Sequence, residues 1–149
     1  MLDDASLNSI DLATDLAVPL PKAWAVLTEQ KFIADWFGDH VKLDAHVGGT
    51  FRETWQQDGR TIITSGTVID LAPPFRIAWT WADDDWSRQT IVVFYLHIPE
   101  DGDGSTCHLH LSHSGWAALR QNRDDGLRLA HEAGWRHHLS NLRTYCENL

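Results

Sequence analysis

The stretch "PPFRIAWTWADDDW", residues 73–86, has the clearest structural pattern in the chain. Its larger apolar residues Ile77, Trp79 and Trp81 alternate with smaller ones, which predicts a half-buried β-strand. Two prolines precede this strand and three aspartates follow it, as is typical of turns. Because side chains two apart in a strand point to the same face, both indoles are aimed at one side of a sheet.

The segments around this strand predict further strands separated by polar turns. "DG" at 58–59 and "PEDGDGS" at 99–105 are typical turn sequences between apolar runs. Successive hairpins of this kind build an antiparallel meander. We expect the additional strands at residues 8–18, 40–47, 48–57, 60–72, 88–98 and 106–114.

Helices are expected at two places in the chain. Two short helices should follow the first strand, one beginning near Pro21 and one over "EQKFIADWF". Near the end, apolar residues recur at spacings of 4, 3, 4 and 3, which is one face of a longer helix: Trp135, Leu139, Leu142, Cys146 and Leu149. The pattern between residues 115 and 133 does not fix where helices break. The order predicts an α+β fold in which the long helix covers one face of a curved antiparallel sheet.

Length and charge limit the class of protein. The 149 residues suit a single domain spanning 1–149, and the net charge of -9 without a basic cluster argues against nucleic acid or an anionic membrane as partner. The acidic start "MLDDASLNSI" does not resemble a signal peptide, and no apolar run approaches the ~20 residues of a membrane span. Cys107 and Cys146 lack motif spacing, so we expect two free thiols and a cytoplasmic protein.

Tryptophan is the unusual component of this composition. The chain has eight tryptophans but only two tyrosines. One interpretation is ordinary core filling. The other is that some of these indoles line a cavity, since they offer large flat surfaces and one hydrogen-bond donor to a small molecule.

Seven short motifs, in order along the chain, resemble one family. They are "WAVLTE" (24–29), "WFG" (36–38), "GGTF" (48–51), "GTV" (66–68), "PPFRIAWTW" (73–81), "LHLSHSGW" (109–116) and "GWRHHLSNL" (134–142). The chain resembles the AHSA-type family, similar to the C-terminal domain of the activator of the heat-shock-protein-90 ATPase, in the START and birch-pollen-allergen-like (SRPBCC) superfamily. The resemblance implies a helix-grip fold, in which an antiparallel sheet wraps the C-terminal helix and leaves a cavity, with Trp79 and Trp81 facing that helix.

This cavity is the expected ligand-binding site. We expect its walls to be Trp79, Trp81, Phe94, Trp135 and Leu139, and its mouth to be Trp36, Phe37 and Trp55. The polar side chains expected to orient a ligand are His113, Glu53 and His138. We expect no metal and no cofactor in it.

Glu53 and His113 each allow two interpretations. Both are in phase with apolar neighbours, so both should point inward. Glu53 is either a desolvated carboxylate able to act as a base or a side chain returned to water or to an arginine. His113 is either a titrating cavity group or a neutral, hydrogen-bonded core histidine. If both line the cavity they should share a proton, so that Glu53→Gln lowers the pKa of His113.

Three further histidines, His97, His108 and His110, lie on two neighbouring expected strands. Imidazoles two residues apart on a strand can reach one metal ion, but no cysteine or carboxylate of fitting spacing completes a site. The simpler interpretation is a solvated polar face.

Three functions are compatible with these observations. The first is the binding of a small hydrophobic molecule in the cavity by a monomer or weak homodimer. The second, implied by the resemblance, is interaction with a chaperone partner in the stress response. The third, implied by enzymes of the wider superfamily, is a cyclase- or hydrolase-type reaction in the same cavity. Ionisable groups inside the cavity would favour the enzyme, and an all-apolar cavity would favour binding.

Overall fold

The computed structural model describes residues 8–120 and 124–149. Its centre is a seven-stranded antiparallel sheet with the strand order β1-β7-β6-β5-β4-β3-β2. The strands are β1 (Ser9–Leu16), β2 (Val41–Leu43), β3 (Thr50–Gln57), β4 (Arg60–Ala72), β5 (Arg76–Asp83), β6 (Thr90–His97) and β7 (Cys107–Ser114). Every strand expected from the sequence is present.

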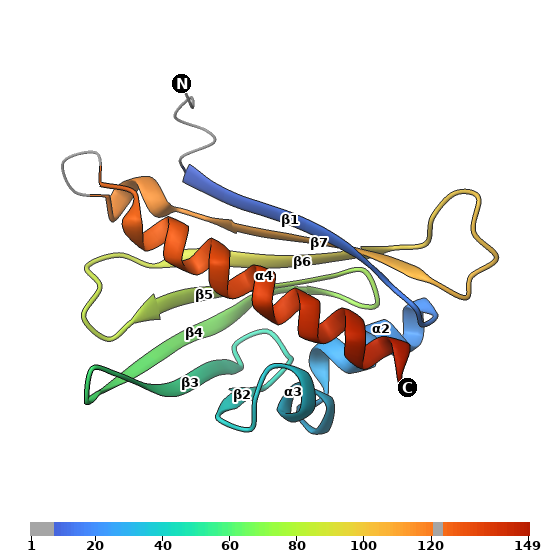
Figure 1. The fold of residues 1–149 in the computed structure, drawn as a ribbon, viewed down its shortest axis with the longest axis horizontal. Coiled ribbons are helices and arrows are strands. Elements are labelled where there is room, and N and C mark those ends of the chain that lie inside the picture. The colour runs from blue at the N-terminus through green and yellow to red at the C-terminus, as the bar shows by residue number, and fades with distance from the viewer. Residues whose placement is uncertain (1–7, 121–123) are drawn as a thin grey trace.

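The helices lie to one side of this sheet. The two short helices α2 (Leu20–Thr28) and α3 (Gln30–Trp36) follow β1, as predicted. The long helix α4 (Gly126–Glu147) runs across one face of the sheet, with α2 and α3 near its C-terminal end (Figure 1). The α+β helix-grip fold is therefore confirmed. No helix in the described ranges is long and apolar enough to cross a membrane.

The strand register explains why one face of the sheet is apolar. One line of cross-strand neighbours runs through Ile10, His113, Val92, Trp79 and Val68, and all five are buried. Side chains two residues apart on a strand point to the same face. The cross-strand lines two residues away on either side therefore also face inward. Trp79 and Trp81 both lie on it, beneath α4, as the alternation in residues 73–86 predicted.

Gly66 lets β4 and β5 approach closely. A Cβ atom at this position would lie 1.6 Å from the backbone oxygen of Thr80. Opposite Gly66 on β3, Phe51 packs its ring on Trp79 and Trp81, with centroid distances of 5.3 and 5.0 Å. The missing side chain of Gly66 thus permits the close strand contact beside the aromatic centre of the core.

The first third of α4 was not predicted, and its residues explain why. Leu127 and Leu129 are exposed, whereas Arg128 between them is buried. The Arg128 guanidinium is held by Asp125 on one side and Glu132 on the other. The apolar pattern is therefore reversed at the start of α4, and the spacing that predicted the helix from Trp135 onward does not extend back through this part. Before α4, a short 3₁₀ helix spans Trp116–Ala118.

Candidate functional site

A pocket of about 260 Å³ opens between α4 and strands β3, β4 and β5. Its lining combines indoles, imidazoles and one carboxyl group. The lining residues are Glu53, Trp55, Thr64, Trp81, Ala130, His131, Gly134, Trp135 and His138.

The regular geometry of the elements brings these residues together. Glu53 and Trp55 are two apart on β3 and therefore share a face. On α4, residues 130, 131, 134, 135 and 138 recur at spacings of three and four, so they form one side of the helix. Five side chains proposed from the sequence meet at this pocket: Glu53, Trp55, Trp81, Trp135 and His138.

Gly134 leaves room for the pocket on its helical side. A Cβ atom built at Gly134 would find no other atom within 4 Å. Ala130 precedes it by one turn and also carries almost no side chain. Glycine inside a helix costs roughly 1 kcal/mol relative to alanine, so this small residue is retained at an energetic cost.

His113 is a neutral structural group rather than a pocket residue. Its Nδ1 accepts a hydrogen bond from the Trp135 indole at 2.9 Å, and its Nε2 lies 2.7 Å from the Thr90 hydroxyl. That hydroxyl donates to the backbone oxygen of Trp81 at 2.8 Å, which assigns the imidazole proton to Nε2. Burial and His131 hold the pKa of His113 well below its usual range. Of the two interpretations, the hydrogen-bonded core histidine is confirmed.

Glu53 has a different partner from the one expected. Its side chain is only 12% exposed, and its Oε2 lies 2.8 Å from the Nε2 of His40. Burial raises the pKa of the Glu53 carboxyl, and the hydrogen bond from His40 opposes this effect. The expected proton shared by Glu53 and His113 is wrong, because both ring nitrogens of His113 are occupied by Trp135 and Thr90.

The two other imidazoles of the pocket, His131 and His138, differ in their hydrogen bonds. His131 donates from Nδ1 to the Leu127 carbonyl at 3.0 Å and accepts from the Trp81 indole at 3.3 Å. The Nδ1 of His138 is buried and has no partner among the described residues. Burial lowers the pKa of both rings, that of His138 to about 4. His138 is therefore a neutral imidazole with a buried, unpartnered Nδ1.

Four residues expected at the cavity belong to the solid core instead. Trp36, Phe37, Trp79 and Phe94 line a void of only about 10 Å³, beside the short helices. Trp36 and Phe37 are buried, so they do not form a mouth. Their rings pack edge to face, tilted or stacked on neighbouring aromatics and leave no space for a ligand.

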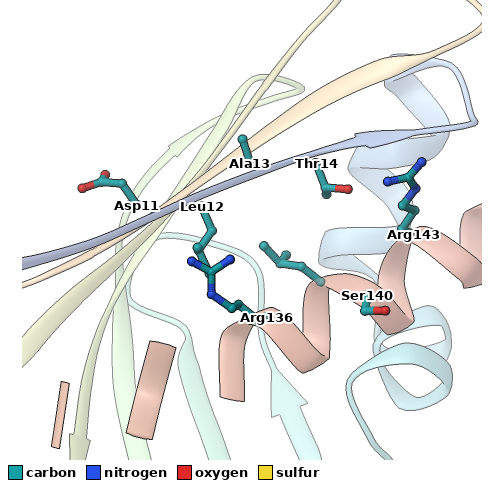
Figure 2. Close-up of a pocket in the computed structure, with 8 residues that line it drawn as sticks. Asp11, Leu12, Ala13, Thr14, Arg136, Ser140 and Arg143 are labelled. Atoms are coloured by element: carbon teal, nitrogen blue, oxygen red, sulfur yellow. The ribbon is translucent and has the colours of Figure 1, made fainter. Parts of the chain in front are cut away.

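Leu139 lies on the other flank of α4, in a groove of about 460 Å³ between this helix and β1. Arg136 and Arg143 project from α4 toward β1 along this groove (Figure 2). Both arginines are exposed and form ion pairs, with Glu132 at 3.7 Å and Glu147 at 3.4 Å. We take the smaller, aromatic pocket as the candidate site, because it is the hollow with buried polar groups.

The histidines on the outer face of the sheet have acidic neighbours. His108 lies 2.7 Å from Asp15, and His110 lies 3.3 Å from Asp11. His97 packs against His108 with ring centroids 4.8 Å apart. Within residues 8–120 and 124–149, no group of three or more potential ligands is arranged to hold a metal ion.

Thr64, Ala130, His131 and Gly134 line the pocket but were not proposed from the sequence. His131 precedes Trp135 by four residues, so helical spacing would have placed it on the same face. That spacing could be used only if α4 was known to extend back at least to His131. No sequence pattern marks Ala130 and Gly134 as pocket residues, because their role depends on the open space next to them.

Comparisons with solved structures relate the fold to proteins of several kinds. DynU16, from the dynemicin biosynthetic locus, superposes with a TM-score of 0.71 at 19% identity, over 94% of this chain and 47% of that one. An HSP90 activator from Plasmodium falciparum superposes with a TM-score of 0.70 at 19% identity, over 92% of this chain and 94% of that one. The Aha1 dimer from Colwellia psychrerythraea superposes with a TM-score of 0.70 at 19% identity, over 91% of this chain and 92% of that one. At these identities the likeness concerns the fold alone.

Sequence comparison identifies the family. No curated protein matches the chain. The family model described as Activator of Hsp90 ATPase homolog 1-like protein, however, matches residues 17–147. This match covers the short helices, strands β2 to β7 and all of α4, so the chain belongs to the Activator of Hsp90 ATPase homolog 1-like family.

Proposed function

We propose that the protein binds a small, mostly apolar aromatic molecule in the pocket between α4 and strands β3 to β5. The observation that supports this most strongly is Gly134. A glycine in the middle of a 22-residue helix costs stability, yet an added side chain there would enter the pocket without a clash. Stability alone would favour a larger residue at this position, so a need for the space explains the glycine.

The size of the pocket limits the ligand. Its volume of about 260 Å³ lies just below the range of roughly 300–1,000 Å³ that is usual for small-molecule sites. Trp55, Trp81 and Trp135 supply flat apolar surfaces around it. A ligand with one ring or two fused rings fits this volume and this lining.

Gly134→Leu tests the proposal by filling the pocket. We expect the variant to lose the thermal stabilisation that mono- and bicyclic aromatic compounds give to the wild type. It should itself be at least as stable as the wild type, because leucine favours the helix more than glycine does. Native mass spectrometry of protein purified from its own cells should likewise show a retained molecule only in the wild type.

Gly134→Ala is the matched control for this experiment. A single methyl group occupies little of the pocket, so ligand binding should persist, while the helix gains roughly 0.5–1 kcal/mol. A Gly134→Leu variant that responds to the compounds as strongly as the wild type would contradict the proposed site. A wild type that responds to no aromatic compound would contradict the proposed function.

An acid–base enzyme is the second candidate. It is favoured by Glu53, a carboxyl with a raised pKa, and by His138, a neutral imidazole with an unpartnered nitrogen, on the wall of one pocket. The test is to incubate a bound compound with the protein and follow its mass. Conversion by the wild type and not by Glu53→Gln, with binding retained, would support catalysis. An unchanged compound would leave binding as the function.

Interaction with a chaperone is the third candidate, and the family match supports it. The solved relative from Plasmodium falciparum is an HSP90 activator. The test is the ATPase rate of purified Hsp90 with and without this protein. Stimulation that persists in Gly134→Leu would place the chaperone contact outside the pocket.

A further inference from the structure

The hydrogen-bond donors on the pocket wall are already used within the protein. The Trp55 indole donates to the Thr64 hydroxyl at 3.0 Å, and that hydroxyl donates to Asp83 at 2.5 Å. The Trp81 indole donates to the Nε2 of His131 at 3.3 Å. None of these three donors is left for a ligand.

The remaining donors of the lining are used in the same way. The Trp135 indole donates to His113 at 2.9 Å, and the Nδ1 of His131 donates to the Leu127 carbonyl at 3.0 Å. All three indoles of the pocket therefore have their N–H groups bonded to protein atoms. Toward a ligand they present only ring surfaces, which carry the negative face of the π-system.

The polar side chain that remains available to a ligand is an acceptor, Glu53. Glu53 receives a hydrogen bond from His40 on Oε2, which leaves acceptor capacity on the carboxylate. The unpartnered Nδ1 of His138 is buried and does not face a ligand directly. No lysine or arginine is among the lining residues of the described chain. The wall therefore contains no fixed positive charge to balance an anion.

We propose that the ligand of this pocket is an organic cation of the arylalkylammonium class, an inference that rests on the proposed binding function. The ammonium group would bond the Glu53 carboxylate and lie against the indole faces, and the aromatic part would fill the rest of the space. Cations are attracted to tryptophan faces within about 6 Å of the ring centroid. The net charge of -9 favours the approach of a cation over that of an anion. Carboxylate-bearing ligands such as fatty acids are disfavoured by the same features.

Three compounds of nearly one shape test the charge preference directly. Tryptamine is a cation at neutral pH, tryptophol is neutral and indole-3-acetate is an anion, and all three share the indole ring system. Isothermal titration calorimetry on the wild type should rank them in that order. We expect tryptamine to bind about tenfold more tightly than tryptophol, which corresponds to about 1.4 kcal/mol. Indole-3-acetate should bind more weakly than either.

Glu53→Gln identifies the source of the preference. The amide keeps the shape of the side chain and removes its charge, so the variant should bind tryptophol as before and lose most of the advantage of tryptamine. Glu100→Gln, in an exposed turn, removes the same charge away from the pocket and serves as the matched control. It should leave the ranking unchanged. The wild-type ranking tests the proposal even if Glu53→Gln is poorly folded.

The outcomes separate this inference from the proposed function. Equal affinities for tryptamine and tryptophol, or tighter binding of indole-3-acetate, would overturn the cation assignment and leave the aromatic pocket in place. Binding of none of the three would contradict both proposals. A preference for tryptamine that persists in Glu53→Gln and disappears in Glu100→Gln would show that the net charge, and not the pocket, selects the ligand, and would also overturn the assignment.

Discussion

At the scale of single residues, His113 and His138 show how hydrogen bonding separates a structural group from a site group. Burial lowers the pKa of both imidazoles. His113 has partners on both ring nitrogens, from Trp135 and Thr90, and so fixes the neighbouring indole in place. The His138 ring packs on Phe37 with ring centroids 4.5 Å apart, and its Nδ1 has no partner among the described residues. The first histidine holds the wall in place, and the second lines the pocket.

Because His138 has a lowered pKa in the fold, it makes stability depend on pH. In the unfolded chain its pKa returns to 6.5, so the unfolded state binds more protons between pH 6.5 and about 4. Its contribution to stability is therefore complete above pH 6.5 and is lost as the pH falls through that range. His113 and His131 act in the same direction. The raised pKa values of Glu53 and Asp83 have the opposite effect on stability, because these carboxyl groups bind protons more readily in the folded state as the pH falls.

His138→Gln should flatten this dependence. The free energy of unfolding should be measured in urea at pH 7.5, 6.0 and 5.0. As the pH falls, it should decrease less steeply in the variant than in the wild type, by up to about 1 kcal/mol per pH unit. His46→Gln is the control, since His46 is exposed and paired with Asp44 at the surface. Curves of the same slope for wild type and His138→Gln would show that this imidazole is not neutralised by the fold.

The sequence predicted which face each residue takes, but not what lies above it. Period two correctly placed Glu53, Trp55, Trp79 and Trp81 on the inner face of the sheet. Trp79 is sealed in the core, where Phe51 and Phe94 pack on its ring, whereas Glu53, Trp55 and Trp81 line the pocket. Whether an inward side chain meets a packed ring or an open space depends on residues far away in the chain, and periodicity contains no such information.

At the scale of elements, α4 carries both the core and the pocket on neighbouring stripes. Leu139 and Leu142 are buried against the sheet, whereas Gly134 and His138 face the pocket. The core stripe was predicted from its spacing. The start of the helix at Gly126 was not, since Arg128 is buried where the pattern requires an apolar residue. The sequence therefore left the helix start undecided in the part where ion pairs replace apolar contacts.

Leu139→Ala measures the contribution of this stripe. Leu139 is 5% exposed, so its truncation should lower the free energy of unfolding by roughly 2–5 kcal/mol, as removal of buried leucines does. Leu129→Ala on the same helix is the control, because Leu129 is 52% exposed and should cost less than about 0.5 kcal/mol. Similar costs in chemical denaturation for the two variants would show that the stripe is not the core contact of α4.

At the scale of the whole molecule, one helix packed against a seven-stranded sheet leaves both of its flanks to be filled. α4 crosses the inner face of the sheet (Figure 1), with the groove beside β1 on one flank and the aromatic pocket beside β3 to β5 on the other. The groove is lined by exposed, ion-paired arginines, and the pocket by buried or half-buried indoles and imidazoles. The fold creates both spaces, and the side chains determine which of them can hold a small aromatic molecule.

The most direct test of the proposed ligand site uses the eight tryptophans as reporters. Their indole N–H resonances should be followed by ¹H–¹⁵N NMR while tryptamine or tryptophol, whichever binds more tightly, is added. The site predicts shifts for Trp55, Trp81 and Trp135, which line the pocket, and unchanged signals for Trp24 and Trp36 near the short helices. Shifts confined to Trp24 and Trp36, with Trp55, Trp81 and Trp135 unmoved at saturation, would contradict it.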